Sequence, residues 1–240
     1  MAGHSKWANI KFRKSVQDAK RGKIFTKLIR EITVAARLGG PDESSNSRLR
    51  DVVSKALKAN MKRDTVDNAI KRGAGGLEGA NMMEMRYEGY GPSGIAILVD
   101  CLSDNKNRTV SEVRHCFTKY GGNLGTDGSV SYLFDKQGEI IIPSSDNKDL
   151  LMDVLIEAGV DDIVDVDNEH ILAITQPEDY HCVLTYLREH HIEVEQSQLA
   201  MRAQNLIRVS GDVTETLEKL IDALEDLDDV QEVYFNAEFE

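Results

Sequence analysis

The residues of this chain whose types and spacing suit a chemical task are lysines and arginines gathered near its N-terminus. Residues 1–75 hold 18 basic and seven acidic side chains, a net charge of +11. The whole chain carries −12, so residues 76–240 carry −23. Because salt screens exposed charges beyond about 8 Å, a polyanion at this surface would respond to the local positive charge. This pattern is typical of proteins that bind the phosphate backbone of nucleic acid.

We predict nucleic-acid contacts for nine cations and one tryptophan of this segment. They are Lys6, Trp7, Lys11, Arg13, Lys14, Lys20, Arg21, Lys23, Lys27 and Arg30. The tryptophan could stack on an unpaired base or ribose, or it could anchor the segment onto neighbouring helices. For the cations, the alternative is a lysine-rich helix face that is only solvated. The prediction requires these cations to be open rather than paired with the protein's own carboxylates.

Other arrangements that could do chemistry are absent from the sequence or incomplete. The glycine-rich GGNLGTDGS at residues 121–129 lacks the order and the lysine of a phosphate loop, so we expect a helix cap followed by a turn. His190 and His191 have no carboxylate or cysteine at ligand spacing. Cys116 follows His115 on a predicted helix, where adjacent side chains diverge by about 100°. We therefore expect no enzyme activity, no metal, no cofactor and no small-molecule substrate.

Cysteine usage and hydropathy indicate where the chain resides. Its three cysteines are widely spaced and odd in number, which favours a reducing compartment over a disulfide framework. No apolar run approaches the roughly 20 residues of a membrane span, and the N-terminus lacks the apolar core of a signal peptide. We expect a cytoplasmic protein without membrane contact.

A helix over residues 23–38 should carry part of the cationic set. Its apolar residues recur at the spacing of one helix stripe, and a Gly-Gly-Pro sequence ends it through a left-handed glycine. Lys27 and Arg30 lie off that stripe, so we expect them to point outward. Helices are also predicted over residues 46–60 and from Asp64, whose side chain suits an N-cap.

A glycine-rich linker near residue 75 separates these helices from a part of the chain whose hydrophobic period is that of strands. Strands are expected at 84–88, 95–101, 130–134, 139–142, 162–167, 170–175, 192–199, 206–209 and 230–235. Helices are expected at 109–120, 148–158, 177–190 and 213–227. We place a hairpin-like turn at residues 135–138, and a solvated polar loop at Asn105, Asn107 and Arg108.

This order predicts an α+β protein. An N-terminal helical domain is followed by two ferredoxin-like α/β domains, the second inserted into the first. The expected domains are residues 1–78, residues 79–134 together with 205–240, and the inserted residues 135–204.

Several stretches carry a resemblance to a known family. They are MAGHSKWANIK, DAKRGKIFTKLIREI, AARLGG, YEGYGP, CLSDNKNRTVSEVRH, KYGGNLGTDGSV and DDVQEVY. With these motifs the chain resembles the YebC family over nearly its full length. Bacterial members are described as probable transcriptional regulators, and mitochondrial relatives as translational activators of cytochrome oxidase subunit synthesis. The resemblance implies three domains, one helical and two α/β, and no cofactor.

Two functions therefore stand as hypotheses. The first is a DNA-binding transcriptional regulator, and the alternative is a ribosome-associated translation factor that contacts ribosomal RNA. The cationic helices are rich in lysine, which positions a protein on phosphate more than it discriminates bases. RNA recognition by shape tolerates such low sequence specificity. A third reading is a protein-interaction adaptor that uses the acidic domains.

Overall fold

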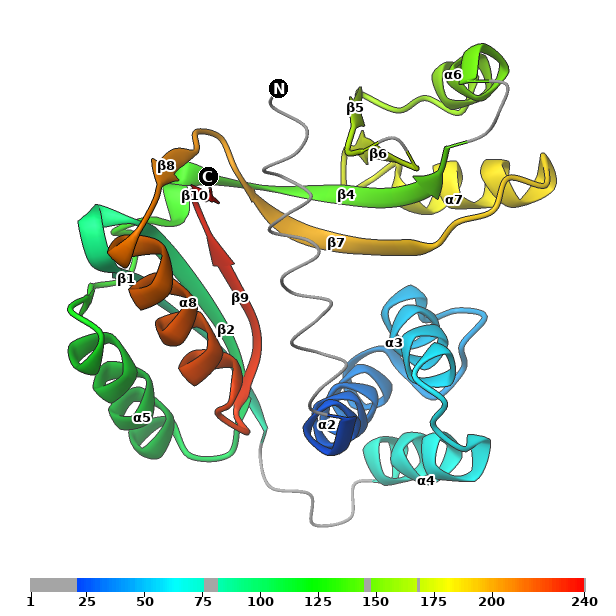
Figure 1. The fold of residues 1–240 in the computed structure, drawn as a ribbon. Helices are drawn as coiled ribbons and strands as arrows, with labels where there is room; N and C mark the ends of the chain where they lie inside the picture. The colour runs from blue at the N-terminus through cyan, green and yellow to red at the C-terminus, as the bar shows by residue number, and fades with distance from the viewer. Residues whose placement is uncertain (1–20, 76–81, 145–147, 168, 240) are drawn as a thin grey trace.

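The computed structural model describes residues 21–75, 82–144, 148–167 and 169–239, and it confirms the α+β class. Helices α2, α3 and α4 form a helical bundle, which faces two antiparallel four-stranded sheets (Figure 1). Two helices pack on each sheet. None of the helices that the structure describes has the length and apolar character of a membrane span.

The helical bundle follows from the apolar stripe of each helix. It consists of α2 (Arg21–Gly39), α3 (Ser47–Lys58) and α4 (Arg63–Ala74). The predicted stripe of α2 is buried at Leu28, Ile32, Ala35 and Ala36, which pack on the apolar residues of α3 and α4. Gly40 follows α2 with φ of 87°, the left-handed conformation that the Gly-Gly-Pro sequence predicted.

Asn46 fixes the turn between α2 and α3. Its side-chain oxygen accepts a hydrogen bond from the backbone N–H of Leu49 at 3.0 Å, which caps α3. Its amide nitrogen donates to the carbonyl of Ala35 at 2.9 Å, so one side chain joins two helices. The prediction that Asp64 caps α4 is wrong. Lys62 occupies that position, and Asp64 lies in the first turn, where its charge favours the helix N-terminus.

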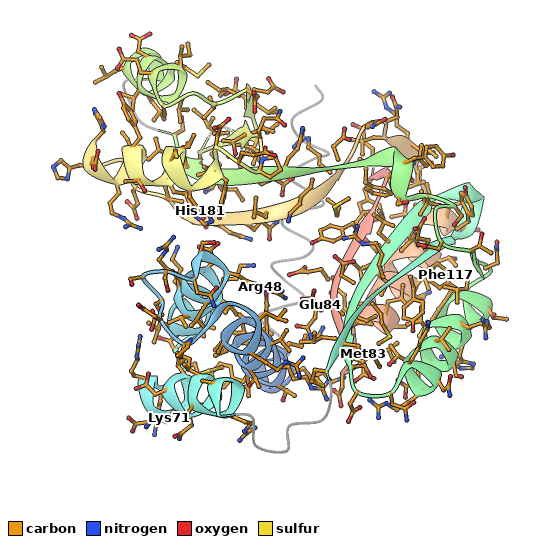
Figure 2. All side chains as sticks on the ribbon, turned by 180° about the vertical axis from the view of Figure 1, so that it is seen from behind. Arg48, Lys71, Met83, Glu84, Phe117 and His181 are labelled. Atoms are coloured by element: carbon orange, nitrogen blue, oxygen red, sulfur yellow. The ribbon has the colours of Figure 1, made fainter. Side chains whose placement is uncertain are left out.

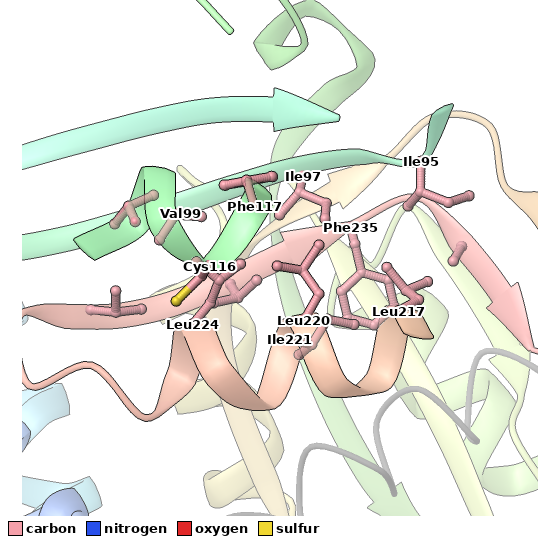
Figure 3. Close-up of a cluster of buried hydrophobic side chains, with 14 of the residues drawn as sticks. Ile95, Ile97, Val99, Cys116, Phe117, Leu217, Leu220, Ile221, Leu224 and Phe235 are labelled. Atoms are coloured by element: carbon pink, nitrogen blue, oxygen red, sulfur yellow. The ribbon is translucent and has the colours of Figure 1, made fainter. Parts of the chain in front are cut away.

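The first sheet has the strand order β3-β1-β2-β9. Its strands are β1 (Met83–Tyr90), β2 (Ala96–Ser103), β3 (Asn123–Leu124) and β9 (Val230–Phe235). Helices α5 (Lys106–Lys119) and α8 (Asp212–Glu225) cover one face, and their apolar side chains form one core with β2 and β9 (Figure 3). The other face packs on the second sheet through Leu98, Tyr234 and Ala200. Covered on both faces, β2 is buried at every residue except Asp100.

The second sheet has the order β5-β6-β4-β7, with all neighbours antiparallel. Its strands are β4 (Phe134–Pro143), β5 (Asp162–Asp165), β6 (His170–Thr175) and β7 (Gln196–Ala203), and its helices are α6 (Lys148–Glu157) and α7 (Tyr180–Glu189). This is the predicted βαββαβ succession, with the strand pairing of a ferredoxin-like sheet. Because β9 returns to the first sheet after it, the second sheet lies within the sequence of the first.

The hairpin-like turn predicted at residues 135–138 is wrong. β4 runs through it, and the strand predicted at 130–134 is instead a short 3-10 turn, Ser131–Leu133, that leads into β4. Gly138 was read as a turn residue, but it marks a close approach. A Cβ atom there would lie 2.3 Å from the hydroxyl oxygen of Thr175 on the neighbouring strand.

The strand predicted at residues 206–209 forms as β8 (Ile207–Val209), but it does not enter the first sheet. It pairs in parallel with β10 (Ala237–Phe239) in a separate two-stranded sheet. In the first sheet, β2 has β1 on one side and β9 on the other, so no place beside β2 is left for β8. The domain boundaries themselves stay an interpretation.

Glu88 of β1 organises the glycine-rich loop after β3. The residue is 3% exposed, and its carboxylate accepts hydrogen bonds from the backbone N–H groups of Gly128, Val130 and Ser131 at 2.7–2.8 Å. Burial alone would raise the pKa of Glu88, but these three donors outweigh it and hold the pKa below its usual value. Of the stretch predicted as a helix cap and turn, Gly121 follows α5 with φ of 75°, the unpredicted strand β3 comes next, and the residues after β3 turn around this buried carboxylate.

Replacing Glu88 by glutamine should destabilise the protein by about 2 kcal/mol at pH 7, because an amide accepts these bonds with one oxygen fewer and no charge. Since the folded-state pKa lies below the unfolded value of about 4.3, this stabilisation is present above that value and is lost as pH falls through the folded one. The loss should therefore shrink in acid. Urea unfolding at pH 7 and pH 4 measures it, with Glu112→Gln on the exposed face of α5 as the control.

Candidate nucleic-acid interface

The structure describes only part of the predicted nucleic-acid set. Lys6, Trp7, Lys11, Arg13, Lys14 and Lys20 lie outside the described residues, so their contacts stay predictions. Arg21 begins α2, and only its backbone is described. The remaining three, Lys23, Lys27 and Arg30, follow one another along one face of α2 at intervals of about one turn.

These three side chains contact the end of α8 and the loop before β9. The Nζ atom of Lys23 donates to the carbonyl of Asp226 at 3.0 Å and lies 3.3 Å from its carboxylate. Lys27 donates to the carbonyl of Glu225 at 2.8 Å. Arg30 donates to the carbonyl of Asp228 at 2.5 Å. We name residues 225–229 the acidic turn.

The expectation that Lys27 and Arg30 point outward is therefore wrong. They do point away from the core of the helical bundle, but they meet the first sheet's α8 rather than solvent. A hydrophobic stripe in the sequence separates a helix's apolar face from its polar face. It does not tell whether the polar face meets water or another part of the same chain.

The end of α8 attracts cations for two physical reasons. The last carbonyl groups of a helix have no partner within the helix, and the helix dipole places partial negative charge there. The acidic turn adds the carboxylates of Glu225, Asp226, Asp228 and Asp229. Burial lowers the pKa of Lys27, and the nearby Glu232 offsets part of that effect.

Asp229 is the most enclosed carboxylate of the acidic turn, with a side chain 3% exposed. One of its oxygens accepts from the hydroxyls of Ser103 and Thr109, both at 2.9 Å, and from Arg108 at 2.7 Å. Its other oxygen accepts from Arg30 of α2 at 3.0 Å. Burial alone would raise the pKa of Asp229, but the bonds from Arg108, Thr109 and Ser103 outweigh it and lower the pKa.

Arg108 was predicted to lie in a solvated polar loop; its side chain is exposed, but the loop is wrong. It occupies the first turn of α5, and its guanidinium binds Asp229 and, at 3.0 Å, Asp104. Asn105 caps the same helix by accepting from the backbone N–H of Arg108 at 3.0 Å. The sequence reasoning missed the Arg108–Asp229 pair because its members are 121 residues apart. No local pattern joins them.

Other cations of the helical bundle differ in how open they are. Lys62, Lys71 and Arg72 of α4 and its cap are exposed, and Figure 2 shows Lys71 on the outer side of the bundle. Arg37 donates to the carbonyl of Met82. Arg48 pairs with Glu84 of β1 (Figure 2). Within the described residues, Lys62, Lys71 and Arg72 thus place open positive charge on α4, while the exposed Arg50 and Lys58 of α3 reach backbone carbonyls at 3.4 and 3.5 Å.

A cavity of about 910 Å³ lies where the helical bundle and both sheets meet. Acidic, basic and apolar side chains all line it, and Arg48 pairs across it with Glu84. His181 of α7 lies 3.7 Å from Asp51 of α3, which joins the bundle to the second sheet (Figure 2). Burial raises the pKa of Glu31, which also lines the cavity. Such a mixed wall does not suit a polyanion.

Two further observations on the described residues concern metal binding and the thiol of Cys101. They hold no group of three or more histidine, cysteine, aspartate or glutamate side chains placed to bind a metal ion. Burial raises the pKa of Cys101 to about 12, so its thiol stays protonated at neutral pH.

Fold and site together define an α+β protein with a cationic helical bundle that is docked on two helix-covered sheets. Two family models match almost the whole chain. Residues 5–76 match the TACO1/YebC protein N-terminal domain, and residues 82–237 match the TACO1/YebC second and third domain. The chain therefore belongs to the TACO1/YebC family, which confirms the resemblance found in its sequence.

Relatives of similar length support the same assignment. A probable transcriptional regulatory protein of Legionella pneumophila (strain Lens) is 70% identical over 239 residues, covering 100% of this chain and 96% of the relative. One of Nitrosococcus oceani is 52% identical over 239 residues, with the same coverage. The crystal structure of a conserved hypothetical protein from Aquifex aeolicus superposes with a TM-score of 0.84 at 44% identity, over 93% of this chain and 92% of that one.

Replacing Asp229 by asparagine should destabilise the protein by about 3 kcal/mol, because it removes the charge that Arg108 and Arg30 bind. The folded-state pKa lies below the unfolded value of about 3.9, so this stabilisation is present above that value and disappears as pH falls through the folded one. Denaturant unfolding at pH 7 measures the loss. Asp104→Asn is the matched control, since it also removes a carboxylate from Arg108 but at an exposed pair. Equal losses in both variants would contradict the role given to Asp229.

Proposed function

We propose that this protein is a nucleic-acid-binding regulator of gene expression that binds the phosphate backbone through its cationic residues 1–75. The observation that carries the proposal is the segregation of charge. Residues 1–75 hold a net +11 and residues 76–240 a net −23. A polyanion is attracted to the first part and repelled by the rest, so one end of the molecule is favoured for contact.

The described part of the bundle supports this proposal at α4. Lys62, Lys71 and Arg72 are exposed there, and they can meet phosphate without breaking a contact within the protein. Six of the nine predicted cations, Lys6, Lys11, Arg13, Lys14, Lys20 and Arg21, would add to that surface, whereas Lys23, Lys27 and Arg30 bind residues 225–229. The proposed target is DNA, because the bacterial relatives bear the name of probable transcriptional regulatory proteins.

A ribosome-associated role on ribosomal RNA is the second candidate. One observation favours it: six of the nine predicted cations are lysines. Lysine presents a compact charge to phosphate, whereas bidentate reading of a guanine edge is chiefly the work of arginine. A surface of this kind suits recognition by shape and charge.

Replacing Lys11, Arg13, Lys14 and Lys20 together by alanine should flatten the salt dependence of binding. Each phosphate contact contributes about −0.9 to the slope of log K against log salt concentration on duplex DNA, so losing up to four contacts changes the slope by as much as about 3.6. Fluorescence anisotropy of a labelled duplex, and of a labelled RNA hairpin, between 50 and 300 mM salt gives both slopes.

The matched control replaces Lys106, Arg114, Lys119 and Lys219 by alanine. These cations are exposed on α5 and α8, so the change in net charge is the same. Its slope should equal that of the unmodified protein. If the two quadruple variants behave alike, the N-terminal cations do not form the interface.

Cross-linking in cells followed by sequencing of the recovered nucleic acid distinguishes the two targets. Transcriptional regulation predicts that promoter DNA is enriched and that the protein does not co-sediment with ribosomes at raised salt. The ribosomal role predicts enrichment of ribosomal RNA and co-sedimentation that the N-terminal quadruple variant loses. Recovery of neither would contradict the proposed function.

A further inference from the structure

We propose that the acidic turn, residues 225–229, is an internal competitor for the nucleic-acid-binding face of α2. In the structure it occupies Lys23, Lys27 and Arg30, and a polyanion and the acidic turn exclude each other from these side chains. The inference rests on the proposed function and adds a closed state to it, in which the protein covers part of its own binding surface.

The acidic turn offers α2 the same kind of acceptors that a phosphate backbone offers. Lys23, Lys27 and Arg30 together reach the carbonyl oxygens of residues 225, 226 and 228, and two of them also reach carboxylate oxygens. Lys23 contacts Asp226, Lys27 contacts Glu225, and Arg30 contacts both Asp228 and Asp229, so successive turns of α2 meet neighbouring residues of the acidic turn. A row of cations spaced by helical turns thus meets a row of anionic and partly anionic oxygens.

The contact is built to separate more readily than a hydrophobic interface. The apolar core of the helical bundle and that of the first sheet share no residue among those described. The contacts that hold α2 to the acidic turn are polar, and the Lys23–Asp226 pair is nearly half exposed. Exposed ion pairs of this kind are worth little and weaken with salt, so the more enclosed Arg30–Asp229 pair is the main polar restraint on separation.

The burial of Lys27 also favours the open state, in which α2 and the acidic turn are apart. Its ammonium group is withdrawn from water in the closed state, and this burial lowers the pKa of Lys27 despite three acidic neighbours. Opening returns the ammonium to water or to phosphate. The anchored partner is Asp229, which Arg108, Ser103 and Thr109 hold in place whether or not Arg30 is bound.

The arithmetic of a two-state equilibrium sets the size of the effect. When only a fraction of molecules is open, the apparent dissociation constant is the intrinsic one divided by that fraction. A closed state favoured about tenfold therefore weakens nucleic-acid binding about tenfold. Removing the competitor should restore that factor without any new contact to the nucleic acid.

The test replaces Glu225 and Asp226 by lysine in the full chain. The new charges repel Lys23 and Lys27, so the contact opens. The control pair Glu112→Lys and Glu189→Lys lies on exposed positions of α5 and α7 and changes the net charge equally. We expect the first pair to bind a labelled duplex about tenfold tighter than the control at one ionic strength. Adding Lys23→Ala and Lys27→Ala to the first pair should abolish the gain.

A second pair guards against loss of folding. Glu225→Gln with Asp226→Asn removes the negative charges without adding positive ones, and its control is Glu112→Gln with Glu189→Gln. The gain should have the same direction and be smaller, and thermal unfolding verifies that all variants fold. Small-angle scattering without nucleic acid should show a larger radius of gyration for the lysine pair than for its control.

The outcomes separate this inference from the proposed function. If the unmodified chain binds nucleic acid and each pair binds as its control does, the acidic turn is no competitor and the inference is overturned. If neither the unmodified chain nor any variant binds duplex or RNA, the proposed function fails and the inference fails with it.

Discussion

The buried carboxylate of Asp229 is the point on which the arrangement of this protein depends. It accepts hydrogen bonds from β2 through Ser103, from α5 through Thr109 and Arg108, and from α2 through Arg30. A carboxylate withdrawn from water is costly unless its acceptor positions are filled, and here donors from three elements fill them. The same group therefore fixes the start of α5 on the first sheet and gives the helical bundle a place to dock.

Sequence reasoning succeeded where a structure repeats locally. The stripe of α2, its end at Gly40 and the βαββαβ order of the second sheet all follow from periodicity and turn residues, and the structure has them. It failed where residues far apart in the chain meet. Gly138 was read as a turn because nothing nearby indicates Thr175, and Arg108 was read as solvated because Asp229 lies 121 residues away. Lys27 and Arg30 show the same limit at the candidate site.

Charge segregation has a structural counterpart in how the two halves meet. The bundle's cations on α2 and Arg48 face acceptors of the acidic half, whereas Lys62, Lys71 and Arg72 remain on its exposed side. Opposite net charges thus draw the halves together, and the same attraction is available to a phosphate backbone. Under the proposed function, one set of side chains serves both cohesion within the molecule and binding of nucleic acid, and both weaken as ionic strength rises.

The segment that forms the second sheet begins and ends at neighbouring positions in space. Phe134, where β4 begins, pairs with Ala203, where β7 ends, and both pack with Ala96 and Leu98 of the first sheet. A segment whose two ends are adjacent can be lengthened, shortened or exchanged without moving the flanking strands. Evolution can therefore remodel this appendage independently of the body that bears it. Because β4 and β7 are paired where this segment joins the first sheet, any motion of the second sheet must bend two paired strands rather than rotate about a single linker.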